Sequence, residues 1–299
     1  MKLHACAIIL LLLGLPAAGS EDSAQTPAAE LRAAAERGGA DAQFQLARAY
    51  LRGEGVPKNP QIAFELMKAA ADQGHADAIG GLGYFYSVGL VVAKDENQAA
   101  ACFRQGAEKR SAKARLNLGK YLLEGRGGAA TDPGKGREEG LQWIKKAADQ
   151  GLCEAALAYG SILYFGGHGL SNDYDNAARY FKTAAAAGDA DAQNFLGSMS
   201  DLGWGGPVDK TMAEQWFRKA ALQGNLKAQS NLGRILGPLS EVKETRIEAL
   251  AWLLIASDQG EVTARKELDD TLAGLKAGEM DAANMRAPEL LKRIHKQAP

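Results

Sequence analysis

The sequence predicts an all-α fold, a solenoid of stacked helical hairpins. A block of the form Ala-x-x-x-Leu-Gly-x-x-Tyr-x-x-Gly, a short loop and a second block Ala-x-x-Trp-x-x-x-Ala-Ala-x-x-Gly together recur six times. Successive copies end 36, 36, 41, 37, 36 and 36 residues apart, and a fixed period of this size indicates stacked supersecondary units rather than one globular enzyme core. The closing positions are Gly38, Gly74, Arg110, Gly151, Gly188, Gly224 and Gly260.

The N-terminus, residues 1–19, has the pattern of a secretory signal peptide. A short basic start at residues 1–4 is followed by an apolar run at residues 5–15 and by small residues up to Gly19, after which we expect cleavage. The run is too short to span a bilayer. We therefore expect an exported chain with no membrane insertion after cleavage. The Ala- and Gly-rich composition and the simple leader favour a bacterial envelope, with the protein periplasmic or secreted.

Residues 20–37 are expected to form a polar leader and an N-terminal capping helix. Thr26 is a favourable N-cap residue, and Pro27 suits the first helical position. The helix that follows matches only the closing half of a repeat. We therefore expect it to cap the array.

Each full repeat within residues 38–260 is expected to hold two helices, A and B. In the first repeat, apolar residues recur at i, i+4, i+5 and i+8 from Ala42, which places them on one face of helix A. Residues 53–57 contain two glycines and a proline, and they break that helix. Helix B begins near Pro60 and ends at Gly74, because glycine readily takes the left-handed conformation that ends a helix.

Two positions in each repeat predict how the helices pack. A glycine recurs inside helix A, where it costs about 1 kcal/mol relative to alanine and is tolerated where another helix approaches closely. These glycines are Gly83, Gly119, Gly160, Gly197 and Gly233. A large side chain recurs in helix B and is expected to fill the space between neighbouring repeats. That position holds Leu66, Cys102, Trp143, Tyr180, Trp216 and Trp252.

The residues at these recurring positions resemble Sel1-like repeats, which are relatives of the tetratricopeptide class. The resemblance spans residues 38–260, and residues 261–299 resemble the C-terminal capping helices of such proteins. It implies a right-handed α/α superhelical solenoid that binds other proteins. The positions that carry it most clearly are Ala78, Leu82, Gly83, Tyr86 and Gly89, with Trp143, Ala147, Ala148 and Gly151.

Composition and motif content argue against nucleic-acid binding and catalysis. The chain has 35 Lys and Arg residues against 36 Asp and Glu residues, so it has no basic excess for a nucleic acid. His75, His168 and His295 have no metal-ligand partner at helical spacing, and we expect them to be solvated. The sequence contains no Gly-x-Ser-x-Gly or His-Glu-x-x-His motif. We therefore expect no enzyme activity, no cofactor and no metal site.

A protein- or peptide-binding surface is expected on the concave face, which helix A lines in solenoids of helical hairpins. Positions −5, −2, +2, +5 and +6 from Leu46 and its equivalents lie opposite the buried face of helix A. Large and cationic side chains recur there, and exposed aromatic and Arg side chains are the usual binding hot spots. The candidate groove residues are Phe44, Arg48, Arg52, Tyr84, Lys120, Tyr164 and Phe165.

Trp204 is a separate candidate contact, because it lies in a Gly-rich loop at a variable position of the repeat. Aromatic anchors flanked by cations suit an extended or acidic polypeptide. The chain itself is expected to be a monomer.

Two other functions stay open at this point. One is an enzyme of the cysteine-rich Sel1-like β-lactamase type, but only Cys102 and Cys153 remain after the leader is removed, without the paired cysteines of that branch. The other is a subunit of a membrane-associated quality-control or assembly complex. A non-enzymatic scaffold or adaptor is the leading hypothesis, because the sequence shows no nucleophile–base cluster.

Overall fold

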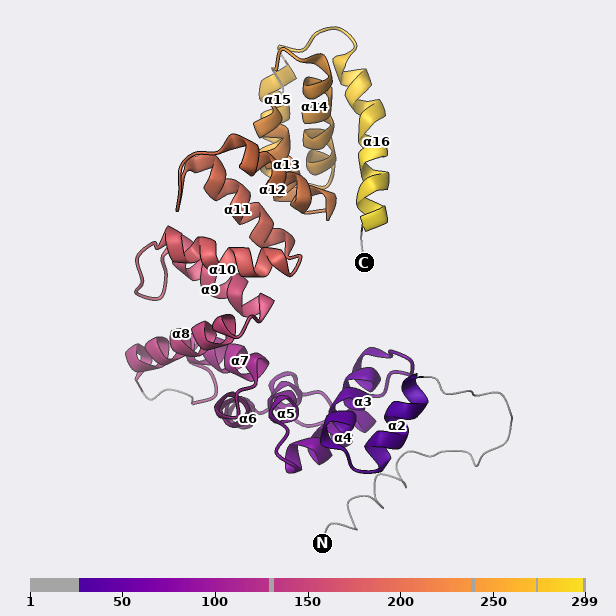
Figure 1. Ribbon diagram of the computed structural model, residues 1–299, viewed down its shortest axis with the longest axis vertical. Helices are drawn as coiled ribbons and strands as arrows, with labels where there is room; N and C mark the ends of the chain where they lie inside the picture. Colours follow the sequence, from indigo (N-terminus) through magenta and orange to yellow (C-terminus); the bar gives the residue numbers. More distant parts are fainter. Residues whose placement is uncertain (1–26, 129–131, 238–239, 273, 298–299) are drawn as a thin grey trace, which may run out of the picture. The chain divides into compact units, whose positions relative to one another are not determined.

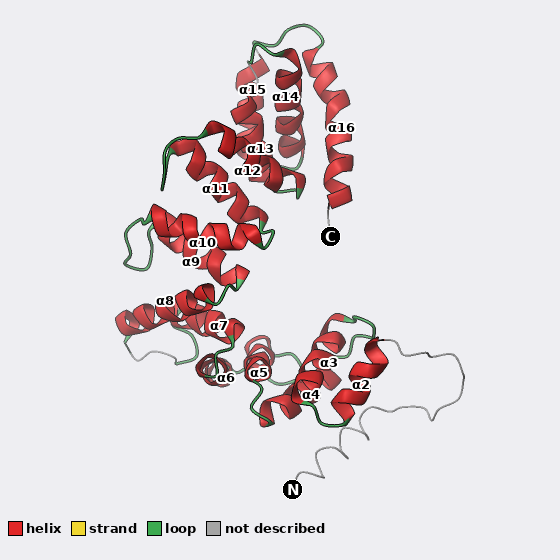
Figure 2. Ribbon diagram, in the orientation of Figure 1, coloured by secondary structure: helices red, strands yellow, loops and turns green. Residues whose placement is uncertain are grey.

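The computed structural model describes residues 27–128, 132–237, 240–272 and 274–297. The predicted signal peptide and the polar leader up to residue 26 lie outside these residues. The described part of the chain forms fifteen α-helices and no strand, which confirms the all-α prediction (Figure 1; Figure 2). The helices are α2 (Pro27–Glu36), α3 (Ala40–Arg52), α4 (Pro60–Asp72), α5 (Ala76–Val88), α6 (Glu96–Glu108), α7 (Ala112–Leu123), α8 (Pro133–Asp149), α9 (Cys153–Phe165), α10 (Tyr174–Ala186), α11 (Ala190–Leu202), α12 (Lys210–Leu222), α13 (Leu226–Leu236), α14 (Lys243–Asp258), α15 (Val262–Leu272) and α16 (Glu279–Gln297).

The helices belong to two compact units, which meet in the sequence between Leu152 and Cys153. Unit 1 contains α2 to α8, and unit 2 contains α9 to α16. In each unit, every helix A packs against the helix B that follows it, and each hairpin packs on the next one. In Figure 1 the hairpins are α3–α4, α5–α6 and α7–α8 in unit 1, and α9–α10, α11–α12 and α13–α14 in unit 2.

Most helices begin at a side chain that caps them. In the first five repeats, helix B starts after an Asn or Asp residue whose side chain accepts backbone N–H groups of the first turn, as Asn59 does from Gln61 and Ile62. Each such cap stabilises a helix by about 1 kcal/mol. The helix B caps are Asn59, Asp95, Asp132, Asp173 and Asp209.

The closing position of each repeat has a left-handed backbone, which explains the recurring glycine. Gly74 has φ of 83° and Gly188 has φ of 95°. Arg110, which replaces glycine at the end of the second repeat, takes φ of 72°. A residue with a Cβ atom is strained in this region, so Arg110 satisfies the repeat at a cost in stability.

The recurring helix A glycines lie directly against large side chains of helix B, as the sequence predicts. A Cβ atom at Gly197 would lie 2.5 Å from the Phe217 ring, and one at Gly233 would lie 2.7 Å from Leu253. The buried side chain is therefore one residue later than the helix B position that we assigned from the sequence. In the six repeats it is Met67, Phe103, Ile144, Phe181, Phe217 and Leu253.

The helix B position assigned from the sequence is buried in three repeats, at Leu66, Tyr180 and Trp252, and only partly buried in the other three. Trp252 is fully buried there, but Trp216 is half-exposed and the Lys219 ammonium lies 4.5 Å from its ring centre. The prediction that this position fills the core in every repeat is therefore wrong. Successive helix residues are rotated by about 100°, so the two adjacent positions face different neighbours, and only the later one is buried in all six repeats. The half-exposed members are Cys102, Trp143 and Trp216.

The C-terminal helices pack on the last hairpin of unit 2. Helices α15 and α16 both contact α14, and α16 also contacts α12. A buried ion pair joins α14 to α16, because the Arg246 Nε donates to the Glu279 Oε1 at 2.9 Å. Among the described residues, no helix has both the length and the hydropathy needed to span a membrane.

Candidate functional site

Three of the five helix A positions selected from the sequence form a stripe at the protein surface. Positions −5, +2 and +6 are seven and four residues apart, so they share one face of the helix. In unit 1 all of them are exposed except Arg48, which is half-exposed. These residues, the unit 1 stripe, are Asp41, Arg48, Arg52, Asp77, Tyr84, Val88, Lys113, Lys120 and Glu124.

The other two positions, −2 and +5, turn toward neighbouring hairpins. Tyr164, at +5 of the fourth repeat, is only 8% exposed, and its ring centre lies 5.1 Å from that of Phe195 and 5.7 Å from that of Tyr174. Burial raises the pKa of the Tyr164 phenol. The prediction that Tyr164 lies on the binding surface is therefore wrong, because the ring packs between hairpins.

Phe44, at −2 of the first repeat, is half-buried. Its ring stacks on that of His75 with centres 4.7 Å apart, and the Arg48 guanidinium lies 5.8 Å from its centre. His75 is not a solvated side chain as expected, since its Nδ1 accepts the Ala78 N–H and caps α5. Phe44 therefore combines a packing role with partial exposure to solvent.

Trp204 has a packing role that the sequence did not reveal. The ring is half-buried, stacks on Tyr174 with centres 4.9 Å apart at 16°, and lies 5.4 Å from Tyr164. The expectation of a loop tryptophan without packing contacts is wrong. Phe165, whose ring centre lies 4.9 Å from that of Tyr164, is 65% exposed and also belongs to unit 2.

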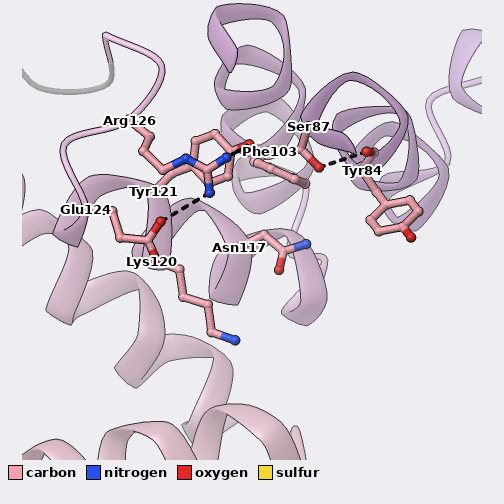
Figure 3. A pocket seen from close by; sticks show the side chains of 8 residues that line it. All are labelled: Tyr84, Ser87, Phe103, Asn117, Lys120, Tyr121, Glu124 and Arg126. Carbon is pink, nitrogen blue, oxygen red and sulfur yellow. Dashed lines mark hydrogen bonds and ion pairs between the residues drawn. The ribbon is translucent and has the colours of Figure 1, made fainter. Parts of the chain in front are cut away.

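Tyr84 and Lys120 are the two candidate residues that the structure brings together. They lie at a hollow of about 180 Å³ in unit 1, between α5, α6 and α7 (Figure 3). Phe103 and Tyr121 are buried and contribute ring surface to it. The lining residues are Tyr84, Ser87, Phe103, Asn117, Lys120, Tyr121, Glu124 and Arg126.

One side of the hollow is a network of paired charges. The Arg126 guanidinium lies 4.2 Å from the Tyr121 ring centre and donates to Glu124 at 3.2 Å and to Glu96 at 3.1 Å. Hydrogen bonds from Lys94 and then Arg126 lower the pKa of Glu96, and the bond to Glu96 raises the pKa of Arg126. The charges on this side of the hollow are therefore paired with one another.

The other side of the hollow is open. Figure 3 shows the side chains of Tyr84 and Lys120 extending away from the Arg126–Tyr121 pair, with Asn117 between them. Tyr84 is 48% exposed, and Lys120 is also exposed. Within the described part of the chain, neither the Lys120 ammonium nor the Asn117 amide has a bonding partner.

Asn117 and Arg126 are site residues that the sequence reasoning missed. Asn117 precedes the buried Leu118 by one position, and a polar residue so close to the helix core was the available signal. Arg126 lies in a Gly-rich loop, where nothing in the repeat pattern indicates a defined contact. Two other cations of the unit 1 stripe, Arg48 and Arg52, contact Gln45 at 3.2 Å and Glu54 at 3.4 Å.

The groups at the hollow suit binding better than chemistry. They comprise a phenol, an amide, an ammonium and a salt-bridged network, without a nucleophile hydrogen-bonded to a base. No group of three or more His, Cys, Asp or Glu residues in the described ranges could hold a metal ion.

The repeat pattern matches a known family model six times. The Sel1 repeat model matches residues 40–75, 76–111, 112–152, 153–189, 190–225 and 226–261. The chain belongs to the Sel1 repeat family. Proteins of this family are generally non-enzymatic scaffolds whose repeats mediate protein–protein interaction.

A solved structure shares this fold. A Sel1 repeat protein from Oxalobacter formigenes is 27% identical with a TM-score of 0.60, over 84% of this chain and 96% of that one. The immunity protein Pa5087 from Pseudomonas aeruginosa is 22% identical with a TM-score of 0.47, over 73% of this chain and 81% of that one. A comparison with curated proteins gave no match.

Proposed function

We propose that the chain is an exported, non-enzymatic scaffold that binds a protein or peptide partner through the unit 1 stripe. The observation that carries this proposal is the hollow between α5 and α7, where Tyr84 and Lys120 from consecutive repeats stand exposed. Val88, one turn from Tyr84, is 51% exposed and extends the apolar part of the stripe. Exposed aromatic side chains beside cations are typical of binding hot spots.

The size of the hollow favours a polypeptide over a small molecule. Pockets that bury small molecules are usually about 300–1,000 Å³. A hollow of about 180 Å³ is smaller, and it opens onto a stripe that continues along α3, α5 and α7. One partner side chain can enter it while the neighbouring partner residues contact the stripe.

Export rests on the leader at residues 1–19, whose basic start, apolar run and small residues fit a signal peptide. The test is expression of the full chain in a bacterial host, followed by fractionation and mass determination of the mature protein. We expect a periplasmic or secreted protein that begins at Ser20. An intact N-terminus in the cytoplasm would contradict export and leave the binding proposal standing.

A site-specific photocrosslinker tests the surface directly. A photoreactive phenylalanine at position 84 or 120 should form adducts with a partner in envelope extracts. The matched controls are positions Lys68 and Gln105, which are exposed on the helix B side of the same unit. Equal crosslinking at all four positions, or adducts from the controls alone, would contradict the assignment of the surface.

A further inference from the structure

The hollow of unit 1 contains one positive charge, on Lys120, that forms no ion pair with any residue that the structure describes. The other cations around it have carboxylate partners, since Arg126 binds Glu96 and Glu124, and Lys94 lies 2.9 Å from Glu96. Lys120 is four residues before Glu124, a spacing that allows an ion pair on a helix. Arg126 engages that carboxylate instead, and Lys120 is left without a counter-charge among the described residues.

The equivalent positions in unit 2 show what is missing. Arg234 is the counterpart of Lys120, at +2 of its repeat, and it donates to Asp201 at 2.7 Å. Asp201 lies at +5 of the preceding repeat, where unit 1 has Ser87. The Ser87 hydroxyl donates to the Tyr84 carbonyl oxygen and carries no charge. Unit 1 thus has the cation of this pair and lacks the carboxylate.

An unused amide lies one turn from Lys120. Asn117 and Lys120 are three residues apart, so they share a helix face, and the half-buried Asn117 amide has no hydrogen-bond partner in the described part of the chain. Its counterpart in unit 2, Asn231, donates to Asn194 at 3.0 Å. An amide offers one acceptor and two donors, which matches the N–H and C=O groups of an extended peptide.

We propose that this hollow binds an acidic side chain of an extended partner segment, with the carboxylate paired to Lys120. The partner backbone hydrogen-bonds the Asn117 amide, and the aliphatic part of the acidic side chain packs on the Tyr84 ring. The partner carboxylate takes the place that Asp201 occupies in unit 2. This inference rests on the proposed function, and it assigns the chemistry of the partner: an Asp or Glu residue within an extended polypeptide.

The experiment uses the mature chain and a phage-displayed library of random 12-residue peptides. Selected binders are synthesised in two forms, with the acidic residue intact or changed to its amide, and affinities are measured by fluorescence anisotropy. We expect acidic residues in the binders, and at least threefold weaker binding of the amide form. Lys120→Gln should weaken binding of the acidic peptide by the same factor and leave the affinity for the amide peptide unchanged.

Three further variants, one of them a control, make the result specific. Ser87→Asp introduces a carboxylate at the position that Asp201 has in unit 2. It should therefore weaken binding of the acidic peptide, while the variant remains folded. Lys120→Glu should reverse the preference, favouring a peptide whose acidic residue is replaced by Lys. Arg48→Gln, the matched cation at +2 of the first repeat, should leave the difference between the two peptides unchanged. Circular dichroism checks that each variant is folded.

The contrary outcomes separate this inference from the proposed function. If Tyr84→Ala weakens binding but Lys120→Gln acts equally on both peptides, the acidic partner is wrong and the surface stands. If phosphate or acetate displaces the peptide at constant ionic strength, the hollow binds free anions and the peptide proposal is wrong. If no binder depends on Tyr84 or Lys120, both the inference and the proposed surface are wrong.

Discussion

Units 1 and 2 use the same helix positions in different ways. At +5 of one repeat and +2 of the next, unit 1 has Ser87 and Lys120, and unit 2 has Asp201 and Arg234. In unit 2 these side chains form an ion pair, and Lys210 binds the same carboxylate. In unit 1 the serine cannot pair with the lysine, so the lysine stays available to a partner.

Aromatic residues follow the same division. Unit 2 collects Tyr164, Tyr174 and Trp204 into one packed cluster, whereas unit 1 leaves Tyr84 48% exposed beside the hollow. The difference teaches that a repeat position does not by itself make a binding residue. The size and charge of the residue at +5 decide whether the neighbouring side chains are used for stability or remain free.

The largest expected effect tests whether the two units share one kind of core. Phe103→Ala and Phe217→Ala should each destabilise their unit by about 3–5 kcal/mol, because each removes a buried ring that packs on a helix glycine. Urea denaturation followed by circular dichroism measures the loss. Trp216→Ala is the matched control and should cost less, since that ring is half-exposed. Equal losses of stability for Trp216→Ala and Phe217→Ala would contradict the assignment of Phe217, rather than Trp216, to the core.

The ion pair of the buried Asp201 carboxylate in unit 2 should come next. Asp201→Asn should cost about 2 kcal/mol, because it weakens charged hydrogen bonds to a side chain that is 2% exposed. Burial opposes ionisation of Asp201, but hydrogen bonds from Lys210 and Arg234 outweigh it and lower its pKa below 3.8. The stabilisation is therefore complete above pH 3.8 and is lost as pH falls through the lower folded pKa.

Denaturation at pH 7 and at pH 3 checks this sign. The parent should lose more stability than Asp201→Asn over that interval. An identical pH dependence in the two proteins would show that the Asp201 carboxylate contributes nothing, and the contrast with Ser87 would lose its energetic basis.

Trp204 tests whether the aromatic residues of unit 2 contribute more to stability than Tyr84 of unit 1. Trp204→Ala should destabilise unit 2 by about 1–2 kcal/mol, because the ring stacks on Tyr174 and touches Tyr164. Tyr84→Ala in unit 1 is the control and should cost less, since Tyr84 is 48% exposed. A loss for Tyr84→Ala equal to that for Trp204→Ala would remove the distinction between a packed and a free aromatic residue.

The smallest effect concerns the one closing position without glycine. Arg110→Gly should stabilise unit 1 by about 0.5 kcal/mol, since it relieves a left-handed residue but adds freedom to the unfolded chain. Gly74→Ala, at the same position one repeat earlier, should destabilise the unit by about 1 kcal/mol. Thermal denaturation of both variants measures whether each substitution raises or lowers stability. Destabilisation by Arg110→Gly would indicate that the arginine makes a contact worth more than the strain.

Much of the fold could be predicted from the sequence, because helix ends and close helix contacts depend on residue types at fixed positions in each repeat. The recurring glycines predicted both the repeat ends and the close approach of helix B, and Gly197 against Phe217 shows that approach. The candidate site was less accessible. Tyr84 and Lys120 were selected correctly as exposed residues, but Tyr164 and Trp204 were not, because burial there depends on aromatic neighbours from other helices.

The sequence by itself determined the helices, the period and the membership of the Sel1 repeat family, since each depends on residue types at set intervals along the chain. Only the tertiary structure decided the rotation of each helix. A helix turns by about 100° per residue, so an error of one position exchanges Trp216 for Phe217 in the core. The free charge at Lys120 was likewise decided in three dimensions, by the serine that faces it from the preceding repeat.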